Sequence, residues 1–440
     1  MEDVGGSSNA NHLCVLVHGL WGNPYHMRNI AKALRSKYGA DELYLLIVKR
    51  NSESFTHDGI ELGGERVSTE IEEEIYATKT RGGLFTKLSI VGYSLGGLVA
   101  RYAIGLLHAK GILDTPWTFT TFVTPHLGVR TPLKGWHNHV WNVVGARTLS
   151  VSGRQLFMVD KFRDTGLPLL SVMADPKSIF MKGLRKFKRH TAYANVVNDT
   201  SSVYYTTGIS KTDPFSDMSK VDVAYVRGGE DVIIDLKKSV VKRSQIMPPI
   251  TPSATPLAIL RVLRRLPLST LQVAMGILGF VIYLLGSVYW NLSSSRRIRL
   301  HEKGLAGIRV EDYRMPLWIM EVREEAERTY EALNNTHENE YLGKDSNGNF
   351  EGETMDLESD TEGVMAKERV LSRPSEPTLA LTPSQFAMID SLNSVGWRRY
   401  PVWIHKDKHS HAAIIVRVDK PTATEGWIVL SHWLEEEFLA

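Results

Sequence analysis

The 440-residue sequence contains a single cysteine, Cys14. Because a disulfide within the chain needs two cysteines, none can form, and metal sites built from several cysteines are excluded as well. A secreted enzyme that depends on disulfides for its stability is therefore not expected.

An excess of charge of either sign is also missing. The 52 Lys and Arg residues are nearly balanced by 49 Asp and Glu residues, which leaves a net charge of +3. This balance is not typical of a dedicated nucleic-acid binder, so we expect no nucleic-acid partner. The first residues, MEDVGGSSNANH, lack a basic region followed by an apolar run, so no secretory signal is predicted. We expect the chain to stay on the cytoplasmic side of any membrane that it meets.

Apolar runs alternate with amphipathic stretches through the first half of the chain. Short apolar runs bounded by turn residues predict buried strands, and longer stretches with apolar residues three or four apart predict helices. The predicted strands are 13–17, 43–48, 87–91, 117–123 and 190–197, and the predicted helices are 24–38, 65–78 and 95–109. Such alternation is typical of a mostly parallel sheet with helices on both faces, so we predict an α/β fold.

A candidate nucleophile stands in the run LSIVGYSLGG, residues 88–97. An apolar strand leads into Gly92-Tyr93-Ser94-Leu95-Gly96, and a helical stretch follows at once. This is the pattern of a nucleophile elbow, in which the serine lies on a tight turn and the flanking glycines avoid collisions with neighbouring backbone. The alternative is a glycine turn without catalytic function. We predict that Ser94 is the nucleophile of a serine hydrolase.

A glycine-rich loop, HGLWG at 18–22, follows the first predicted strand. In folds with a nucleophile elbow this position carries one half of the oxyanion hole. The backbone N–H groups of Leu20 and Leu95 are therefore the predicted donors to the oxyanion. We expect His18 to orient the loop rather than to act as the general base.

The acid of a catalytic triad in this fold comes after the serine and before the histidine. Asp199 follows the strand-like stretch YANVVN, where a carboxylate can orient an imidazole ring. The alternative is a turn in which Asp199 only caps the end of the strand. Three other aspartates are weaker candidates, namely Asp213, Asp217 and Asp222.

The general base follows by elimination, because no histidine lies between Asp199 and the uncharged segment described below. His301 and His337 lie in charged stretches, and His432 lies in a predicted terminal helix. Three histidines remain after the strand-like stretch YPVWI (400–404), namely His405, His409 and His411. We predict His411 as the base, because it directly precedes the apolar run AAIIVRV (412–418), with His409 as the alternative. A zinc site formed by these three residues is the other reading, but their spacing matches no usual ligand set.

Taken together, several motifs resemble one known family. They are HGLWGN, THDGIELGGERVSTEI (56–71), GYSLGGLVARYAIG (92–105), TPHLGVR (124–130), SGRQLF (152–157) and YANVVND (193–199). The chain resembles the serine esterases of the α/β-hydrolase superfamily, and within them the fungal lipid-droplet phospholipases and related lipases. The likeness covers residues 12–235 and a return near 400–418. It implies the α/β-hydrolase fold, hydrolysis of lipid esters, and catalysis by Ser94, Asp199 and His411.

The composition changes from about residue 236. Residues 237–265 contain seven Lys and Arg residues and no acid, residues 266–295 contain no charged residue, and residues 321–376 contain 16 acids against six bases. We therefore expect a hydrolase core that a long insertion interrupts before the last strand. The expected parts are a flexible N-terminus (1–11), a core (12–235) with a candidate lid (126–160), a basic linker with a membrane-associating segment (236–320), a disordered acidic insertion (321–380) and the C-terminal part of the core (381–440).

The uncharged segment 266–295 is longer than the roughly 20 residues that a membrane-spanning helix needs. A single crossing would separate Ser94 and Asp199 from every remaining candidate histidine, which is incompatible with a working triad. We expect the segment to enter and leave on one face, as a hairpin or an interfacial helix, at a lipid-droplet or endoplasmic reticulum surface. A buried helix and a true span in a non-catalytic protein are the alternatives. The basic flanks would meet anionic head groups, through Arg261, Arg264, Arg265, Arg296, Arg297 and Arg299.

The sequence thus predicts a phospholipase or lipase that acts on phospholipid or acylglycerol and needs no cofactor. The first alternative is a catalytically inactive hydrolase-like protein that tethers membranes. The second keeps the triad and changes the acceptor, which gives a transacylase or a thioesterase.

Overall fold

The computed structural model describes residues 4–113, 115–129, 150–199, 202–216, 218, 221–241, 292–301, 303, 379 and 381–440. At its centre lies a six-stranded sheet in the order β2-β1-β3-β4-β5-β8, and every neighbouring pair of strands is parallel. These strands are β1 His12–Val17, β2 Leu43–Ile47, β3 Lys87–Tyr93, β4 Pro116–Phe122, β5 Arg189–Asn195 and β8 Trp397–Val402. Two short strands, β6 Val221–Asp222 and β7 Val240–Val241, form a separate antiparallel pair.

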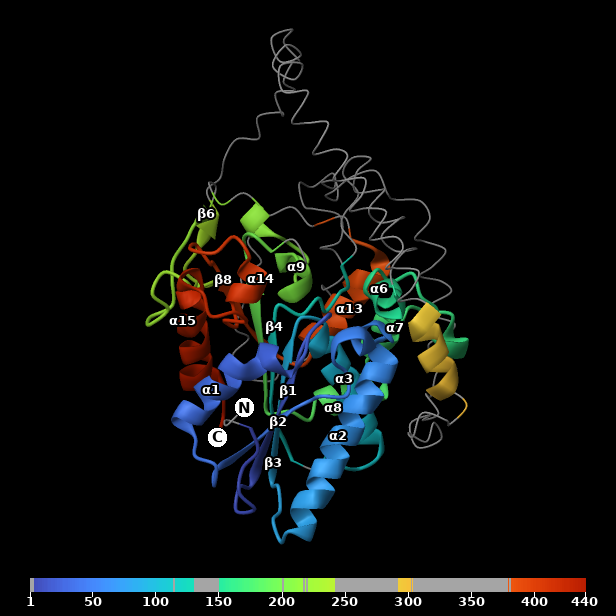
Figure 1. The fold of residues 1–440 in the computed structure, drawn as a ribbon. Coiled ribbons are helices and arrows are strands. Elements are labelled where there is room, and N and C mark those ends of the chain that lie inside the picture. Colours follow the sequence, from blue (N-terminus) through green and yellow to red (C-terminus); the bar gives the residue numbers. More distant parts are fainter. Residues whose placement is uncertain are drawn as a thin grey trace, which may run out of the picture.

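Helices cover both faces of the sheet (Figure 1), as predicted for a parallel α/β fold. The main helices are α1 Arg28–Lys37, α2 Ile60–Thr80, α3 Leu95–Ala109, α6 Val151–Leu156, α7 Leu169–Ala174, α8 Ile179–Leu184, α9 Tyr204–Thr207, α13 Pro383–Asn393, α14 Ser410–Ala413 and α15 Thr424–His432. The turns η1 Pro24–Met27 and η2 Glu53–His57 join β1 to α1 and β2 to α2. Helices α1 and α15 lie on one side of the sheet, and α2, α3 and α8 lie on the other.

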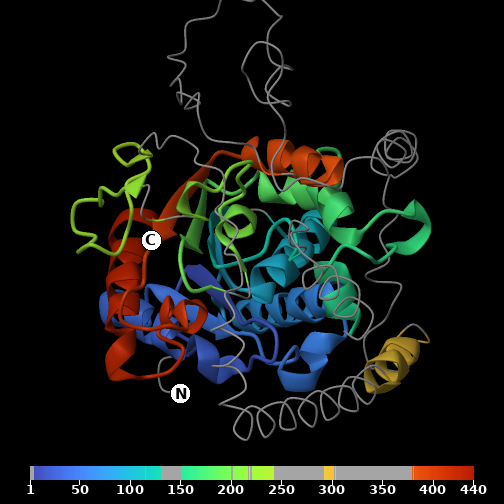
Figure 2. The same ribbon diagram turned by 90° about the horizontal axis from the view of Figure 1, so that it is seen from above.

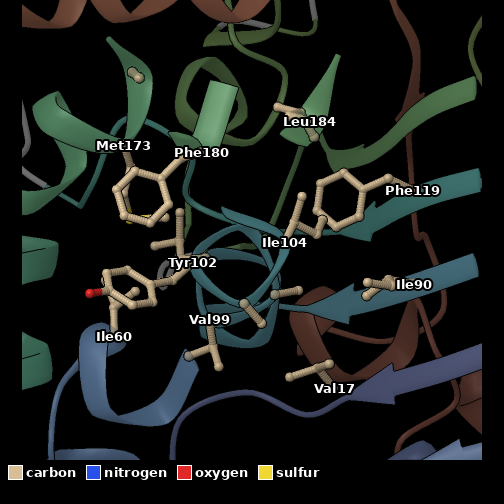
Figure 3. Packing of buried hydrophobic residues seen from close by; sticks show 14 of the residues in the cluster. Val17, Ile60, Ile90, Val99, Tyr102, Ile104, Phe119, Met173, Phe180 and Leu184 are labelled. Carbon is tan, nitrogen blue, oxygen red and sulfur yellow. The ribbon is translucent and has the colours of Figure 1, made fainter. Parts of the chain in front are cut away.

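Two apolar layers hold these helices to the sheet. Figure 3 shows the first layer. In it, Val99 and Tyr102 of α3 lie between the neighbouring helices and the strands of the sheet, which carry Phe119. The close approach of α2 to α3 needs a glycine, because a Cβ atom on Gly64 would come within 2.6 Å of the Tyr102 side chain. In the second layer the fully buried Trp433, which directly follows α15, packs against Phe122 of β4. Burial of these residues is the main force that stabilises the sheet.

The start of two predicted helices differs from the sequence-based expectation. The helix predicted over 24–38 is divided into η1 and α1, and Asn23 caps η1 by accepting a hydrogen bond from Tyr25 N at 3.0 Å. The helix predicted over 65–78 begins five residues earlier, at Ile60, after Gly59 with a φ of 103°. Glycine is one of the few residues that adopts this φ without strain, so the chain turns into α2 at that point.

The apolar run 412–418 is neither a strand nor a long helix. Its first residues end the short helix α14, and a turn follows in which Val416 has a φ of 51°. Ile414, Ile415 and Val416 are nevertheless buried and belong to the second apolar layer. Their spacing could not reveal this, because a short continuous apolar run has no period that separates strand, helix and turn.

The long insertion separates β7 from α13 and so precedes β8, the last strand of the sheet. Residues 130–149 of the candidate lid, residues 242–291 and residues 304–378 lie outside the described part of the chain. The predicted membrane-associating segment and the predicted disordered acidic insertion therefore lie almost entirely outside it. Within the described ranges, no helix combines the length and the apolar character needed to cross a bilayer.

Candidate active site

Ser94 lies on the turn between β3 and α3, at the carboxyl ends of the parallel strands. Its φ of 54° and ψ of −130° are unusual for a residue with a side chain, and such strain is typical of functional turns. The flanking glycines are required sterically. A Cβ atom on Gly92 would lie 2.3 Å from Gly97 Cα, and one on Gly96 would lie 2.3 Å from Val17 O. The turn has the geometry of a nucleophile elbow.

His411 lies on α14 and faces Ser94. Its Nε2 atom is 3.0 Å from Ser94 Oγ, and its Nδ1 atom is 2.8 Å from Asp199 Oδ2. With Nδ1 protonated, the ring donates to the carboxylate and accepts the serine hydroxyl hydrogen at Nε2. The structure therefore joins the three residues of the predicted triad in one chain of hydrogen bonds.

Asp199 is fixed by neighbours that the sequence analysis did not identify. Its side chain is 1% exposed, and it accepts hydrogen bonds from Asn195 Nδ2 at 3.1 Å and from Ser202 N at 2.8 Å. A carboxylate that accepts several hydrogen bonds keeps one orientation. Asn195 lies four residues earlier in the quoted YANVVND motif, and its amide was the sequence signal that could have indicated a partner for Asp199.

Each of the other histidine candidates within the described part of the chain contacts a different residue. His409 is exposed, and its backbone N–H donates to Asp407. The side chains of the other three histidines contact other partners, namely Glu425 for His405 at 3.4 Å, Glu65 for His301 at 2.6 Å and Tyr193 for His432 at 2.8 Å. His337 lies outside the described residues. In the described ranges no three His, Cys, Asp or Glu residues are grouped so that they could hold a metal ion.

Two of the three aspartate alternatives lie in the described part of the chain. Asp222 is exposed on the short strand β6, and the Asp213 carboxylate accepts a hydrogen bond from Phe215 N at 3.1 Å. Asp217 lies outside the described residues. Asp199 is thus the candidate acid that the described structure brings to His411.

The glycine-rich loop after β1 lies directly against the elbow, since a Cβ atom on Gly19 would come within 2.8 Å of Ser94 Cβ. Within the described residues, the backbone N–H groups of Leu20 and Leu95 form no hydrogen bond and are free to bind an oxyanion. His18 is buried, and burial lowers its pKa to about 4. Its ring contacts Gly19 O at 3.2 Å, which agrees with a loop-orienting residue.

Tyr93 is another residue whose role the sequence analysis missed. Its hydroxyl group donates to the backbone oxygen of His411 at 2.9 Å, and the two rings lie 5.3 Å apart. Burial raises the pKa of Tyr93, so the hydroxyl group keeps its hydrogen. The residue before the nucleophile therefore holds the backbone of the candidate base, and no sequence pattern indicates such a contact.

A family model described as "Putative serine esterase (DUF676)" matches residues 7–213, which include β1, the elbow, Ser94 and Asp199. This part of the chain is therefore similar to that serine esterase family. The match ends before α14, so His411 lies outside it.

Two fungal proteins are among the relatives of this chain. Over 213 residues the chain is 30% identical to the putative lipase ROG1 of Saccharomyces cerevisiae, a match that covers 45% of this chain and 28% of the relative. Over 201 residues it is 27% identical to the putative lipase C4A8.10 of Schizosaccharomyces pombe, with 44% and 25% covered. The match thus spans less than a third of each of these relatives.

Solved structures of lipases show a distant likeness. The Bacillus licheniformis lipase BlEst2 in its propeptide form aligns with a TM-score of 0.30 at 15% identity, over 44% of this chain and 37% of that chain. A lipase-esterase related protein from Clostridium acetobutylicum aligns with a TM-score of 0.27 at 12% identity, over 46% of this chain and 82% of that chain.

Proposed function

We propose that this protein hydrolyses lipid esters through an acyl-enzyme on Ser94. One observation carries the proposal, namely that His411 lies 3.0 Å from Ser94 Oγ and 2.8 Å from Asp199 Oδ2. These are the contacts by which a nucleophile, a base and an orienting acid act together.

In the proposed acylation step, Ser94 Oγ attacks the ester carbonyl carbon and His411 Nε2 takes the serine proton. The oxyanion that forms accepts hydrogen bonds from the N–H groups of Leu20 and Leu95. The carbon–oxygen bond to the leaving alcohol then breaks, and His411 returns the proton to that alcohol. In the second half, water attacks the acyl carbon while His411 takes a proton from the water. The bond to Ser94 Oγ then breaks, His411 returns the proton to Ser94 Oγ, and the fatty acid leaves.

The substrate class is proposed from two lines of support. The matching family is one of serine esterases, and the fungal relatives carry lipase names. The sequence adds an uncharged segment, 266–295, of the length that membrane-associated proteins use. We therefore propose phospholipids or acylglycerols as substrates, met at a membrane or lipid-droplet surface on its cytoplasmic side.

The attachment of the chain on either side of residues 242–291 supports a segment that enters and leaves on one face. Before it, β7 pairs with β6 of the hydrolase. After it, a helix at 292–301 binds the hydrolase through Arg297 and Asp58. Arg297 was expected to meet lipid head groups. The structure shows instead that it forms a part-buried ion pair within the protein.

The test uses the full-length protein and its Ser94→Ala, His411→Ala and His409→Ala variants. Each is assayed for fatty-acid release from phospholipid and from triacylglycerol emulsions. We expect kcat to fall by about 10⁴-fold or more in the first two variants and to change less than about twofold in His409→Ala. The His409 variant is the matched control, because it removes an exposed imidazole two residues from the candidate base.

Other results would point elsewhere. Full activity in His411→Ala would move the base to another residue and contradict the proposed triad. A folded wild type without activity on either emulsion or on a soluble ester would favour an inactive tethering protein. Transfer of the acyl group to an added alcohol or thiol in preference to water would identify a transacylase, and rapid cleavage of acyl thioesters alone would identify a thioesterase.

A further inference from the structure

The loop that carries Leu20 is held by segment 53–58, which comprises η2 and the residue after it. The backbone N–H of Trp21 donates to Thr56 Oγ1 at 3.0 Å, and its indole Nε1–H donates to His57 Nε2 at 2.8 Å. The Trp21 side chain is 62% exposed, so apolar burial contributes little to its position. Its φ of 53° is a conformation that a large residue keeps only when its surroundings hold it. Two hydrogen bonds therefore fix the residue next to Leu20.

Both acceptors of these hydrogen bonds are in the required chemical state. The Thr56 hydroxyl hydrogen is donated to a backbone carbonyl of the same turn at 2.6 Å, which leaves the oxygen to accept from Trp21 N. Burial lowers the pKa of His57; the Asp58 carboxylate opposes this effect, and the Arg297 guanidinium adds to it. At neutral pH the ring is therefore uncharged, and its Nε2 atom can accept the indole N–H.

Asp58 connects this segment to a helix more than 230 residues later in the chain. Its side chain has no exposed surface, and Arg66 Nη2 donates to Oδ2 at 2.7 Å. Arg297 donates to the same carboxylate from Nε at 3.0 and 2.9 Å and from Nη2 at 2.7 Å. A buried carboxylate is stabilised only when it is paired, so this double ion pair is a specific link between Asp58 and the helix at 292–301.

The same helix also binds two backbone carbonyls of the segment. Arg297 Nη2 donates to Ser54 O at 3.0 Å, and Ser294 Oγ donates to His57 O at 3.3 Å. Figure 2 shows the helix, in yellow, at the rim of the molecule. Contacts to Asp58 and to the carbonyls on either side of Thr56 restrict the whole turn that holds Trp21.

We propose that Thr56, His57 and Arg297 are positioning residues for the oxyanion hole. The inference rests on the proposed function and adds to it that the helix following the uncharged segment is part of the catalytic unit. Arg297 fixes Asp58, the turn that ends there fixes Trp21, and Trp21 fixes the N–H of Leu20. The stabilisation that an oxyanion hole gives depends on where its donors lie. A shift of the loop by about 1 Å should therefore lower kcat and leave substrate binding unchanged.

The experiment measures kcat and KM of the full-length protein on a soluble short-chain ester, so that attachment to lipid does not affect the result. The variants are Thr56→Val and Arg297→Ala, together with their double variant. Two exposed residues provide matched controls, Thr80→Val for the lost hydroxyl and Lys303→Ala for the lost cation. Binding of a trifluoromethyl ketone, which forms an oxyanion on the serine, is measured for each.

We expect Thr56→Val and Arg297→Ala each to lower kcat by about tenfold, a part of the 10²–10³-fold effect of losing one oxyanion donor outright. KM should stay within about twofold, and ketone affinity should fall by the same factor as kcat/KM. The double variant should lose less than the product of the single losses, because both substitutions act through Trp21. Arg297→Lys, which keeps the buried charge without the planar fork, should fall between wild type and Arg297→Ala.

Three results would overturn the inference while leaving the proposed function intact. They are an unchanged kcat in folded Thr56→Val and Arg297→Lys, a rise in KM with no change in kcat, and equal losses in the two controls. A Ser94→Ala variant as active as the wild type would instead contradict the proposed function, and the inference with it. Arg66 remains beside Asp58 in Arg297→Ala, so we expect the variant to fold, which its thermal unfolding curve checks.

Discussion

His411 and Ser94 are 317 positions apart in the sequence, yet His411 Nε2 lies 3.0 Å from Ser94 Oγ. The contact forms because β8 adds to the free edge of β5, which brings α14 over the end of β3. Ser410 Oγ donates to Val197 O at 2.8 Å and ties α14 to the loop that carries Asp199. The C-terminal part of the chain therefore completes the candidate site.

The first prediction concerns the carboxylate behind His411. Asp199→Asn keeps the size of the side chain and removes its charge, so the ring is no longer held in the tautomer that accepts the serine proton. We expect kcat on a soluble ester to fall by about 10³–10⁴-fold with little change in KM. Asp222→Asn, which changes an exposed rival aspartate, should keep at least half of the wild-type rate. Equal rates for the two variants would assign the acid elsewhere.

The second prediction concerns Tyr93. Tyr93→Phe removes the hydroxyl group that donates to His411 O and leaves that part-buried oxygen with one partner fewer. We expect the free energy of unfolding to fall by about 1–2 kcal/mol and kcat to fall by about three- to tenfold, because α14 loses a contact beside the base. Denaturant unfolding and steady-state kinetics measure the two effects. A loss of stability with an unchanged kcat would show that the contact is only structural.

A third prediction separates the glycines by the space around them. A Cβ atom on Gly96 would lie 2.3 Å from Val17 O and 2.5 Å from His18 O, which are backbone atoms that cannot move away independently. Gly96→Ala should therefore destabilise the protein by about 3 kcal/mol or more and abolish activity. At Gly39 the nearest atom would be 3.8 Å away, so Gly39→Ala should unfold within a few degrees of wild type. The thermal unfolding temperatures of both variants, compared with that of the wild type, test this prediction.

The fourth prediction follows from Asp160. Burial raises the pKa of this carboxyl from 3.8 to about 6, and its Oδ1 atom has no hydrogen-bond partner within the described residues. Because the folded state holds the proton more tightly than the unfolded state, stability falls as the pH rises from about 4 to about 6 and stays lower above that. Asp160→Asn, which can still accept the Leu169 N–H, removes this loss.

The measurement for Asp160 is urea unfolding at several pH values. We expect the variant to exceed the wild type by about 1–2 kcal/mol at pH 7.5, a figure discounted for partial solvent contact, and to equal it near pH 4. An advantage that is the same at pH 4 and pH 7.5 would contradict the assigned burial.

Much of the fold follows from patterns that span only a few residues. The apolar runs before HGLWG and before GYSLGG predict β1 and β3, and both strands are buried almost throughout. The elbow at Ser94 follows from the steric demand of its turn, which only glycine at positions 92 and 96 satisfies. Such features depend on the local backbone and on burial, and the sequence determines both directly.

Other features depend on which distant side chains meet. His409 and His411 lie in the same short stretch, and the rotation of α14 decides which of them faces Ser94. Arg297 and His301 lie in a charged stretch, and their buried partners, Asp58 and Glu65, come from the first hundred residues.

The sequence by itself therefore determined the parallel sheet, the nucleophile turn and a short set of candidates for the acid and the base. Tertiary structure alone decided that His411 meets Ser94 and that Arg297 meets Asp58. The physical reason is that polar pairs specify their partners through geometry at distances of about 3 Å, and long-range packing creates that geometry. Apolar side chains, in contrast, can be buried against any suitable neighbour, and their regular spacing along the sequence reveals the elements that they belong to.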